Sequence, residues 1–183
     1  MRSGLKLQEC HLTSQGLSPC TFKVCKASSD ICQIRLNFES LSLGQPSTSS
    51  VLDSNPNSRG QCQEDQFTAT SDGPAPPVLC GSNTGQHMIL EAREDCNTIT
   101  VTWGTSGTLE SRTWNIHISQ LSCQDPWAPP QGCLQYFTGT AGEIFSYNYQ
   151  GGLHLASQVR QWSGEPLNTF LMFSFTPTAS DRR

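Results

Sequence analysis

The sequence predicts an all-β fold, an antiparallel β-sandwich of six or seven short strands. Apolar and polar residues alternate with the two-residue period of a strand in several segments, and no long segment shows the period of an amphipathic helix. Only 14% of the 183 residues are charged, against roughly 25% in an ordinary globular domain. Solubility therefore depends on uncharged polar residues, as it does in many secreted β-proteins.

The strands follow from this alternation, taken along the chain. One side of the segment 33–39 is apolar, and the phase changes before 41–43, which predicts a bulge near Ser40. Residues 98–103 and 114–118 alternate in the same way. The side chains expected to face the core are Ile34, Leu36, Phe38, Leu41, Leu43, Ile99, Val101, Trp103, Trp114, Ile116 and Ile118. Shorter candidate strands are 20–25, 65–70 and 86–92.

Three polar or proline-rich segments separate these strands. Residues 44–61 and 71–77 are rich in turn formers and predict exposed loops. The proline-rich segment 123–132 predicts a corner between two domains.

The charge pattern and the hydropathy of the chain exclude several classes of partner. The net charge is -4 and the 11 Lys and Arg residues are scattered, whereas nucleic acid requires clustered basic residues. No apolar stretch is long enough to span a membrane. The first residues lack the apolar core of about 7–15 residues that a signal peptide has, so we expect an incomplete start.

Nine cysteines indicate disulfides and therefore a secreted, extracellular protein. Zinc is disfavoured because no C-x-x-C pair occurs. Cys62 and Cys80 lie where strands run into turns, and we expect them to pair. Spacing also suggests that Cys25–Cys32 closes a hairpin and that Cys123–Cys133 closes the corner. Cys10–Cys20 is a further pairing, which leaves Cys96 as the odd thiol.

Several motifs in order resemble a CUB domain. They are Cys20 to Val24, Ile34 to Leu43, Cys62-x-x-Asp65-x-Phe67, Cys80-Gly81, and Arg112 to Ile118. The strings Ile31 to Leu36, Gly85 to Met88 and Ala128 to Phe137 are similar to arthropod secreted proteins with tandem CUB-like modules. The resemblance implies a jelly-roll β-sandwich and an incomplete second module. It divides the chain into an N-terminal segment with a truncated start (1–19), a CUB-like sandwich (20–122), the start of a second CUB-like module (123–158) and a divergent tail (159–183).

The resemblance also raises the question of calcium, which one branch of the CUB family binds through several carboxylates. Asp65 matches one of these ligands. No carboxylate lies near Gly44, where another is expected, and only Glu110 is in reach of the third position, around Thr105–Ser106. Ca²⁺ takes six to eight oxygen ligands, so Asp65 offers an incomplete site and we expect no cofactor. The alternative is that Asp65 accepts backbone N–H bonds and organises its loop.

We expect no catalysis, because the sequence has no Gly-x-Ser-x-Gly and no H-E-x-x-H motif. The first functional hypothesis is an extracellular module that binds a protein or a carbohydrate. The second is a fragment of a larger secreted CUB-containing protease or cascade protein. Trp127, between prolines, is a candidate interface anchor, or it fills the corner between the modules.

Overall fold

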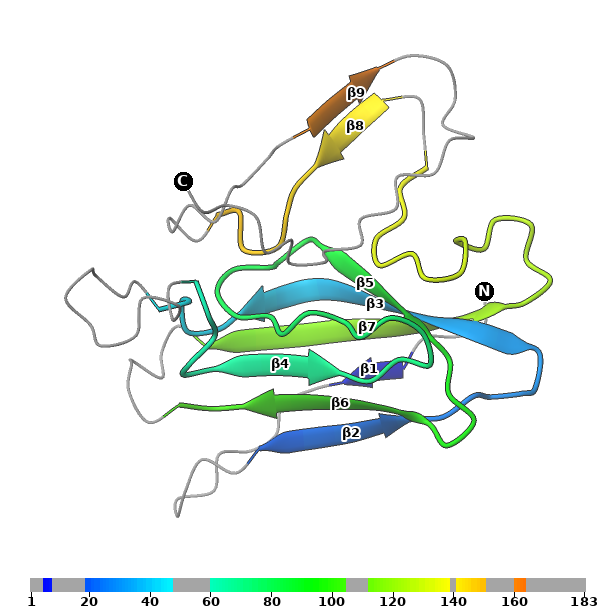
Figure 1. Cartoon of the computed structure of the whole chain (residues 1–183), viewed down its shortest axis with the longest axis horizontal. Helices are drawn as coiled ribbons and strands as arrows, with labels where there is room; N and C mark the ends of the chain where they lie inside the picture. Colours follow the sequence, from blue (N-terminus) through cyan, green and yellow to red (C-terminus); the bar gives the residue numbers. More distant parts are fainter. Residues whose placement is uncertain are drawn as a thin grey trace.

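The computed structural model describes residues 5–7, 19–47, 60–104, 112–138, 141–150 and 160–163. Within these ranges the chain forms strands and no helix (Figure 1). No described segment is therefore a helix long and apolar enough to cross a membrane. The strands are β1 (Leu5–Leu7), β2 (Cys20–Val24), β3 (Ile31–Ser42), β4 (Gln66–Ala69), β5 (His87–Glu91), β6 (Asn97–Thr102), β7 (Thr113–Ser122), β8 (Ala141–Ile144) and β9 (Arg160–Ser163).

Two antiparallel sheets form the sandwich, which confirms the predicted fold class. One sheet has the order β1-β7-β3-β5 and the other has the order β2-β6-β4 (Figure 1). The pairing of β3 with β7 changes register between Phe38 and Ser40, which is the predicted irregularity. A separate pair, β8 and β9, lies beyond this sandwich.

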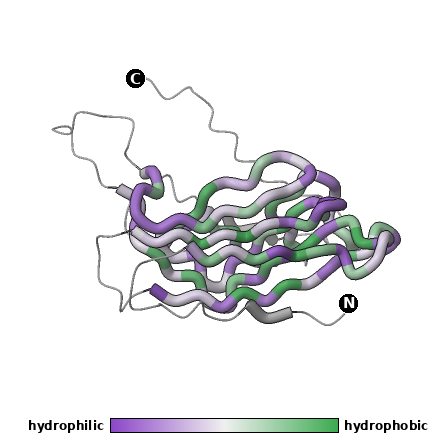
Figure 2. Tube along the Cα trace, turned by 90° about the horizontal axis from the view of Figure 1, so that it is seen from below, coloured by the Kyte–Doolittle hydropathy of each residue, from purple (hydrophilic) through white to green (hydrophobic). Residues whose placement is uncertain are grey.

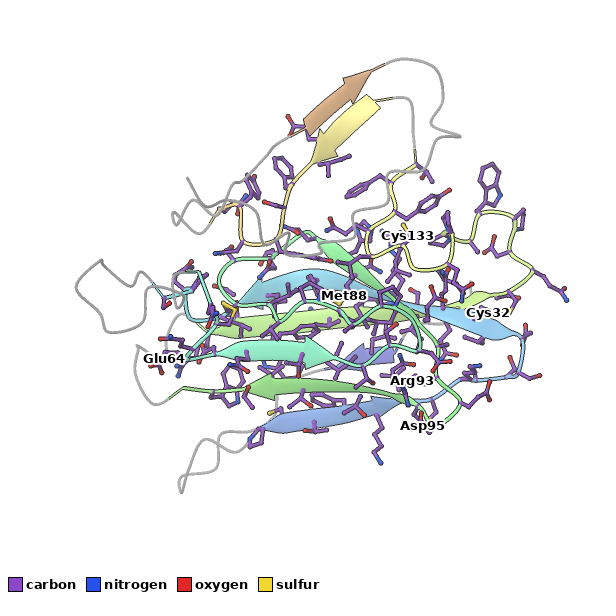
Figure 3. The ribbon with its side chains drawn as sticks, in the orientation of Figure 1. Cys32, Glu64, Met88, Arg93, Asp95 and Cys133 are labelled. Carbon is purple, nitrogen blue, oxygen red and sulfur yellow. A yellow bond between two sulfur atoms is a disulfide. The ribbon has the colours of Figure 1, made fainter. Side chains whose placement is uncertain are left out.

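Apolar side chains from the facing sides of the two sheets form the core. Green, apolar positions recur along the strands in Figure 2, and Met88 of β5 is fully buried (Figure 3). Aromatic pairs connect the two sheets: Phe38 of β3 contacts Phe67 of β4 with ring centroids 5.5 Å apart. Of the side chains expected to face the core, all are buried except Trp103, which is partly buried and packs against the rest. Burial of each large side chain contributes about 1.5–3 kcal/mol to folding.

Two of the three described disulfides join segments that are distant in sequence, and the third closes a shorter loop. Cys62 pairs with Cys80, as the sequence suggests. The proposed Cys25–Cys32 pairing is wrong, because Cys25 pairs with Cys96 across 71 residues. The register explains this bond. Val24, the last residue of β2, lies opposite Asn97, the first residue of β6. Cys25 follows Val24 and Cys96 precedes Asn97, so the two cysteines lie side by side.

The proposed Cys123–Cys133 pairing is also wrong, because Cys123 pairs with Cys32 at the register shift between Ile31 and Gln33. Ile31 of β3 lies opposite Ser122 of β7, and the bond joins Cys32 to Cys123. Cys133 is left as a free thiol, so the odd cysteine is not Cys96. Cys20 is also disulfide-bonded, and the proposed Cys10–Cys20 pairing involves a cysteine outside the described residues.

Candidate binding surface

Asp65 lies at one end of the sandwich, just before β4, and is 1% exposed. Its Oδ2 accepts hydrogen bonds from the Gly44 amide at 2.6 Å and from Arg112 Nε at 2.7 Å. Its Oδ1 accepts one from the Gly104 amide at 3.0 Å. The adjacent Glu64 marks this end of the sandwich in Figure 3. Asp65 thus holds the ends of strands from both sheets together.

Asp65 and the three residues that donate to it come from four chain segments. Gly44 follows β3 and Arg112 precedes β7, in one sheet, whereas Asp65 precedes β4 and Gly104 follows β6, in the other. Glycine is required at Gly104, because a Cβ there would lie 2.8 Å from the backbone of Glu64. The sequence therefore brings two backbone amides and one guanidinium to a single buried anion.

These residues do not fit a calcium site. Arg112 already places a positive charge 2.7 Å from Asp65, and both side chains are buried. The Arg112 guanidinium also lies 5.9 Å from the centre of the Trp103 ring, which favours the same position for the cation. Within the described ranges, no cluster of three or more His, Cys, Asp or Glu side chains is placed to hold a metal ion. The backbone N–H bonds to Asp65 are those that the loop-organising alternative expects.

Trp127 lies on a different surface, where the segment after β7 folds back over the outer face of the first sheet. It is 74% exposed, so it does not fill a corner between modules. It borders a pocket of about 560 Å³. The floor comes from residues on the outer sides of β3 and β7, namely Arg35, Asn37, His117, Ser119 and Leu121. The rim comes from the following segment, namely Asp125, Trp127, Pro129, Tyr136 and Thr138.

The Tyr136 side of the rim is held in place by hydrogen bonds between β5 and the segment that contains it. The Ile89 amide donates to the Leu134 carbonyl at 2.8 Å. His87 Nε2 accepts from the Tyr136 amide at 2.9 Å, and the Tyr147 hydroxyl donates to the His87 carbonyl at 2.8 Å. Burial first, and then the nearby Arg35 charge, lower the pKa of His87 to about 3. The neutral His87 can therefore act as an acceptor at physiological pH.

Cys133 lies in the segment 125–138, which packs beside β5, and it is shielded from solvent. It is 2% exposed, and its Sγ lies 3.0 Å from the Gln135 carbonyl, to which it donates. Burial raises the pKa of the Cys133 thiol to about 11. The thiol is therefore protonated and unreactive in the folded protein. Figure 3 shows it in the segment next to β5.

Sequence reasoning finds Trp127 and Asp65 but misses most of the pocket. Arg35 and Asn37 are visible in the sequence as polar positions on a long strand. Nothing local indicates that β7 and the 125–138 segment meet them to form a concave surface. The one sequence signal that could have indicated the pocket is the position of Arg35, a charged residue in the middle of the longest candidate strand.

Two comparisons with known proteins give no match: no curated protein and no solved structure matches the chain. One family model, described as animal CUB domain, matches residues 130–179. The matched part begins in the segment docked on β5 and continues past residue 158, where we expected divergence. The proposed domain boundaries, the tandem arrangement and the likeness to arthropod proteins stay predictions. Together with the three described disulfides, the CUB match over residues 130–179 points to an extracellular binding module.

Proposed function

We propose that this protein is a non-catalytic extracellular recognition module that binds a protein or a carbohydrate through the pocket beside Trp127. The observation that carries the proposal is the 74% exposure of this tryptophan at the rim of a pocket of about 560 Å³. Exposed tryptophan is uncommon on the surface of a monomer, and tryptophan is enriched among the residues that dominate binding energy.

The shape of the surface supports this proposal. A pocket of this volume lies in the range of about 300–1,000 Å³ that is usual for ligand sites. Its floor belongs to the central strands of a sheet, and Tyr136 of its rim is hydrogen-bonded to His87 of β5. A partner would therefore meet a largely preformed surface, which lowers the entropic cost of binding.

The experiment compares wild type and Trp127→Ala on arrays of extracellular proteins and of glycans. We expect Trp127→Ala to weaken binding to at least one captured target by about 30-fold, the effect of a hot-spot residue. The melting temperature should not change, because the indole is exposed.

Val78→Ser is the matched control. Val78 is the other large hydrophobic residue with high exposure among the described residues, at 48%. It lines a separate pocket of about 360 Å³ beside the Cys62–Cys80 disulfide. The proposal is wrong if Trp127→Ala binds every captured target as wild type does, or if only Val78→Ser loses binding.

A further inference from the structure

Arg35 lies at the centre of the pocket floor. It is on β3, opposite Ile89 of β5 and Ser119 of β7, and it is partly buried. Burial lowers the pKa of Arg35, although a guanidinium remains charged in proteins. The fold thus holds the charged Arg35 guanidinium in a partly buried position, where it has lost part of its hydration.

No carboxylate in the described part of the chain forms an ion pair with Arg35. By contrast, Lys26, Arg93 and Arg112 each lie within 4 Å of one. Arg35 Nε donates to Asn37 Oδ1 at 2.8 Å. The other guanidinium nitrogens have no described hydrogen-bond partner, and they are not among the enclosed polar atoms that lack one. They therefore face open space with their donors unused.

The other charged or titratable side chains of the pocket do not neutralise Arg35. Asp125 borders the pocket, but its Oδ1 accepts from the Trp127 amide at 2.9 Å and so organises the rim. His117 lies on the floor and Tyr136 on the rim, and neither side chain is a carboxylate. An incoming carboxylate would find both terminal nitrogens of the Arg35 fork available, which is the geometry that binds carboxylate with two parallel hydrogen bonds.

We infer that this pocket binds the carboxylate of an Asp or Glu side chain of a partner protein, with Arg35 as the anion-binding group and Trp127 packing on the neighbouring peptide. The inference rests on the proposed function and specifies the chemistry of its ligand. Trp, Tyr and Arg, the residue types most enriched at binding hot spots, meet here in Trp127, Tyr136 and Arg35.

A single acidic side chain fits this pocket better than an acidic polysaccharide does. A polyanion binds through several cations spread along a surface. This pocket contains one permanent cation and the acid Asp125, in a chain whose net charge is -4. The charges match one carboxylate in a peptide, not a row of sulfates or uronates.

The test uses two pools of synthetic 12-residue peptides with random flanks, one with Glu and one with Gln at the centre. We expect immobilised wild type to retain the Glu pool at least tenfold more than the Gln pool. Arg35→Gln should lower this ratio to about one, and Arg35→Lys, which keeps the charge without the fork, should give an intermediate ratio.

Arg93→Gln is the matched control, because it removes the same charge from an arginine that does not line the pocket and that already lies within 4 Å of Asp72 and Asp95. It should leave the ratio unchanged. Melting temperatures of all variants show that each is folded. Equal retention of the two pools by wild type, no retention of either pool, or a preference for Glu that Arg35→Gln keeps would each overturn the inference.

Two further arms separate this inference from the proposed function and from a glycan ligand. If wild type retains the Glu and Gln pools equally and Trp127→Ala retains neither pool, the carboxylate inference is refuted and the proposed binding surface is supported. If the preference for the Glu pool is lost in Arg35→Gln but kept in Trp127→Ala, binding of a carboxylate by Arg35 is supported and the role of Trp127 as the interface anchor is refuted. Displacement of the Glu pool by N-acetylglutamate supports a protein ligand, whereas displacement only by a glucuronate polymer overturns it.

Discussion

At the scale of residues, two ion pairs show how burial determines the contribution of an ion pair to the free energy of unfolding. Asp65 and Arg112 are 0% and 7% exposed in their side chains. In the pair Lys26–Glu94, Glu94 is 89% exposed. A buried pair has lost its hydration, so removal of one partner leaves a charge without compensation. An exposed pair is replaced by water at almost no cost.

Arg112→Gln should therefore lower the free energy of unfolding by about 3–5 kcal/mol. Urea unfolding at pH 7 measures the change. Glu94→Gln is the control and should unfold as wild type does. Equal effects of the two substitutions would contradict the bridging role of the buried pair.

Calcium should leave the stability of this protein unchanged. A ligand raises the melting temperature only when its concentration is well above its dissociation constant, and Arg112 already occupies the side of Asp65 where a cation would bind. Melting curves with and without millimolar calcium should coincide, with magnesium as the control for ionic strength. A rise of several degrees with calcium alone would show that a site exists.

His87 should make the protein less stable in mild acid. Its pKa falls from 6.5 to about 3 on folding, so between these values the unfolded chain binds a proton that the folded chain does not. The stabilisation is complete above pH 6.5 and decreases as pH falls, by up to about 1.4 kcal/mol per pH unit.

His87→Gln keeps an acceptor for the Tyr136 amide but cannot titrate. Urea unfolding of wild type and His87→Gln at pH 7.5 and pH 5.5 isolates this contribution, because the carboxylates are common to both proteins. We expect a smaller loss of stability in His87→Gln. Parallel losses in the two proteins would refute the assignment.

At the scale of elements, the disulfides report which strands are neighbours. Cys25–Cys96 joins β2 to the start of β6, and Cys32–Cys123 joins β3 to the end of β7. In the entropic model, closing loops of this length adds about 4–5 kcal/mol each, and the shorter Cys62–Cys80 loop adds about 3 kcal/mol.

Peptide mapping without reduction should recover Cys25 linked to Cys96 and Cys32 linked to Cys123. Cys133 should be alkylated only after unfolding, because it is buried. A peptide that links Cys25 to Cys32, or Cys123 to Cys133, would contradict this arrangement and restore the pairings suggested by spacing.

The strands could be predicted from the sequence because alternation is a local property. The bulge near Ser40 is also local and appears in the pattern of buried positions. The bonds of Cys25 and Cys32 could not be predicted, because they depend on which strands pair in each sheet. The pocket around Arg35 could not be predicted for the same reason, because its floor combines residues of β3 and β7 and its rim comes from a loop.

At the scale of the whole molecule, the sandwich and the following segment are one structural unit at β5. The family match begins at residue 130. Four residues after this point nevertheless form hydrogen bonds with β5 or the loop before it, namely Leu134, Tyr136, Tyr147 and Asn148. The sequence boundary at residue 123 does not show this dependence, because it marks a change in composition and not the loss of contacts. The proposed binding pocket needs both parts, since its floor and rim come from opposite sides of that boundary.

The Ile89–Leu134 hydrogen bond has a consequence for solubility. β5 is the last strand of its sheet, and an uncovered edge is a template on which another chain can add a strand.

A chain shortened to end at Gln124 keeps Cys123 but uncovers His87 and Ile89, which are 5% and 4% exposed in the whole chain. We expect this shortened chain to self-associate, and multi-angle light scattering would detect it. Replacing Ile89 by Lys should restore the monomer, since a charge on an edge strand opposes strand addition. Self-association of the shortened chain would mean that the segment after the sandwich prevents aggregation in addition to forming part of the proposed binding site. A shortened chain that stays monomeric without the lysine would show that the β5 edge does not need to be covered.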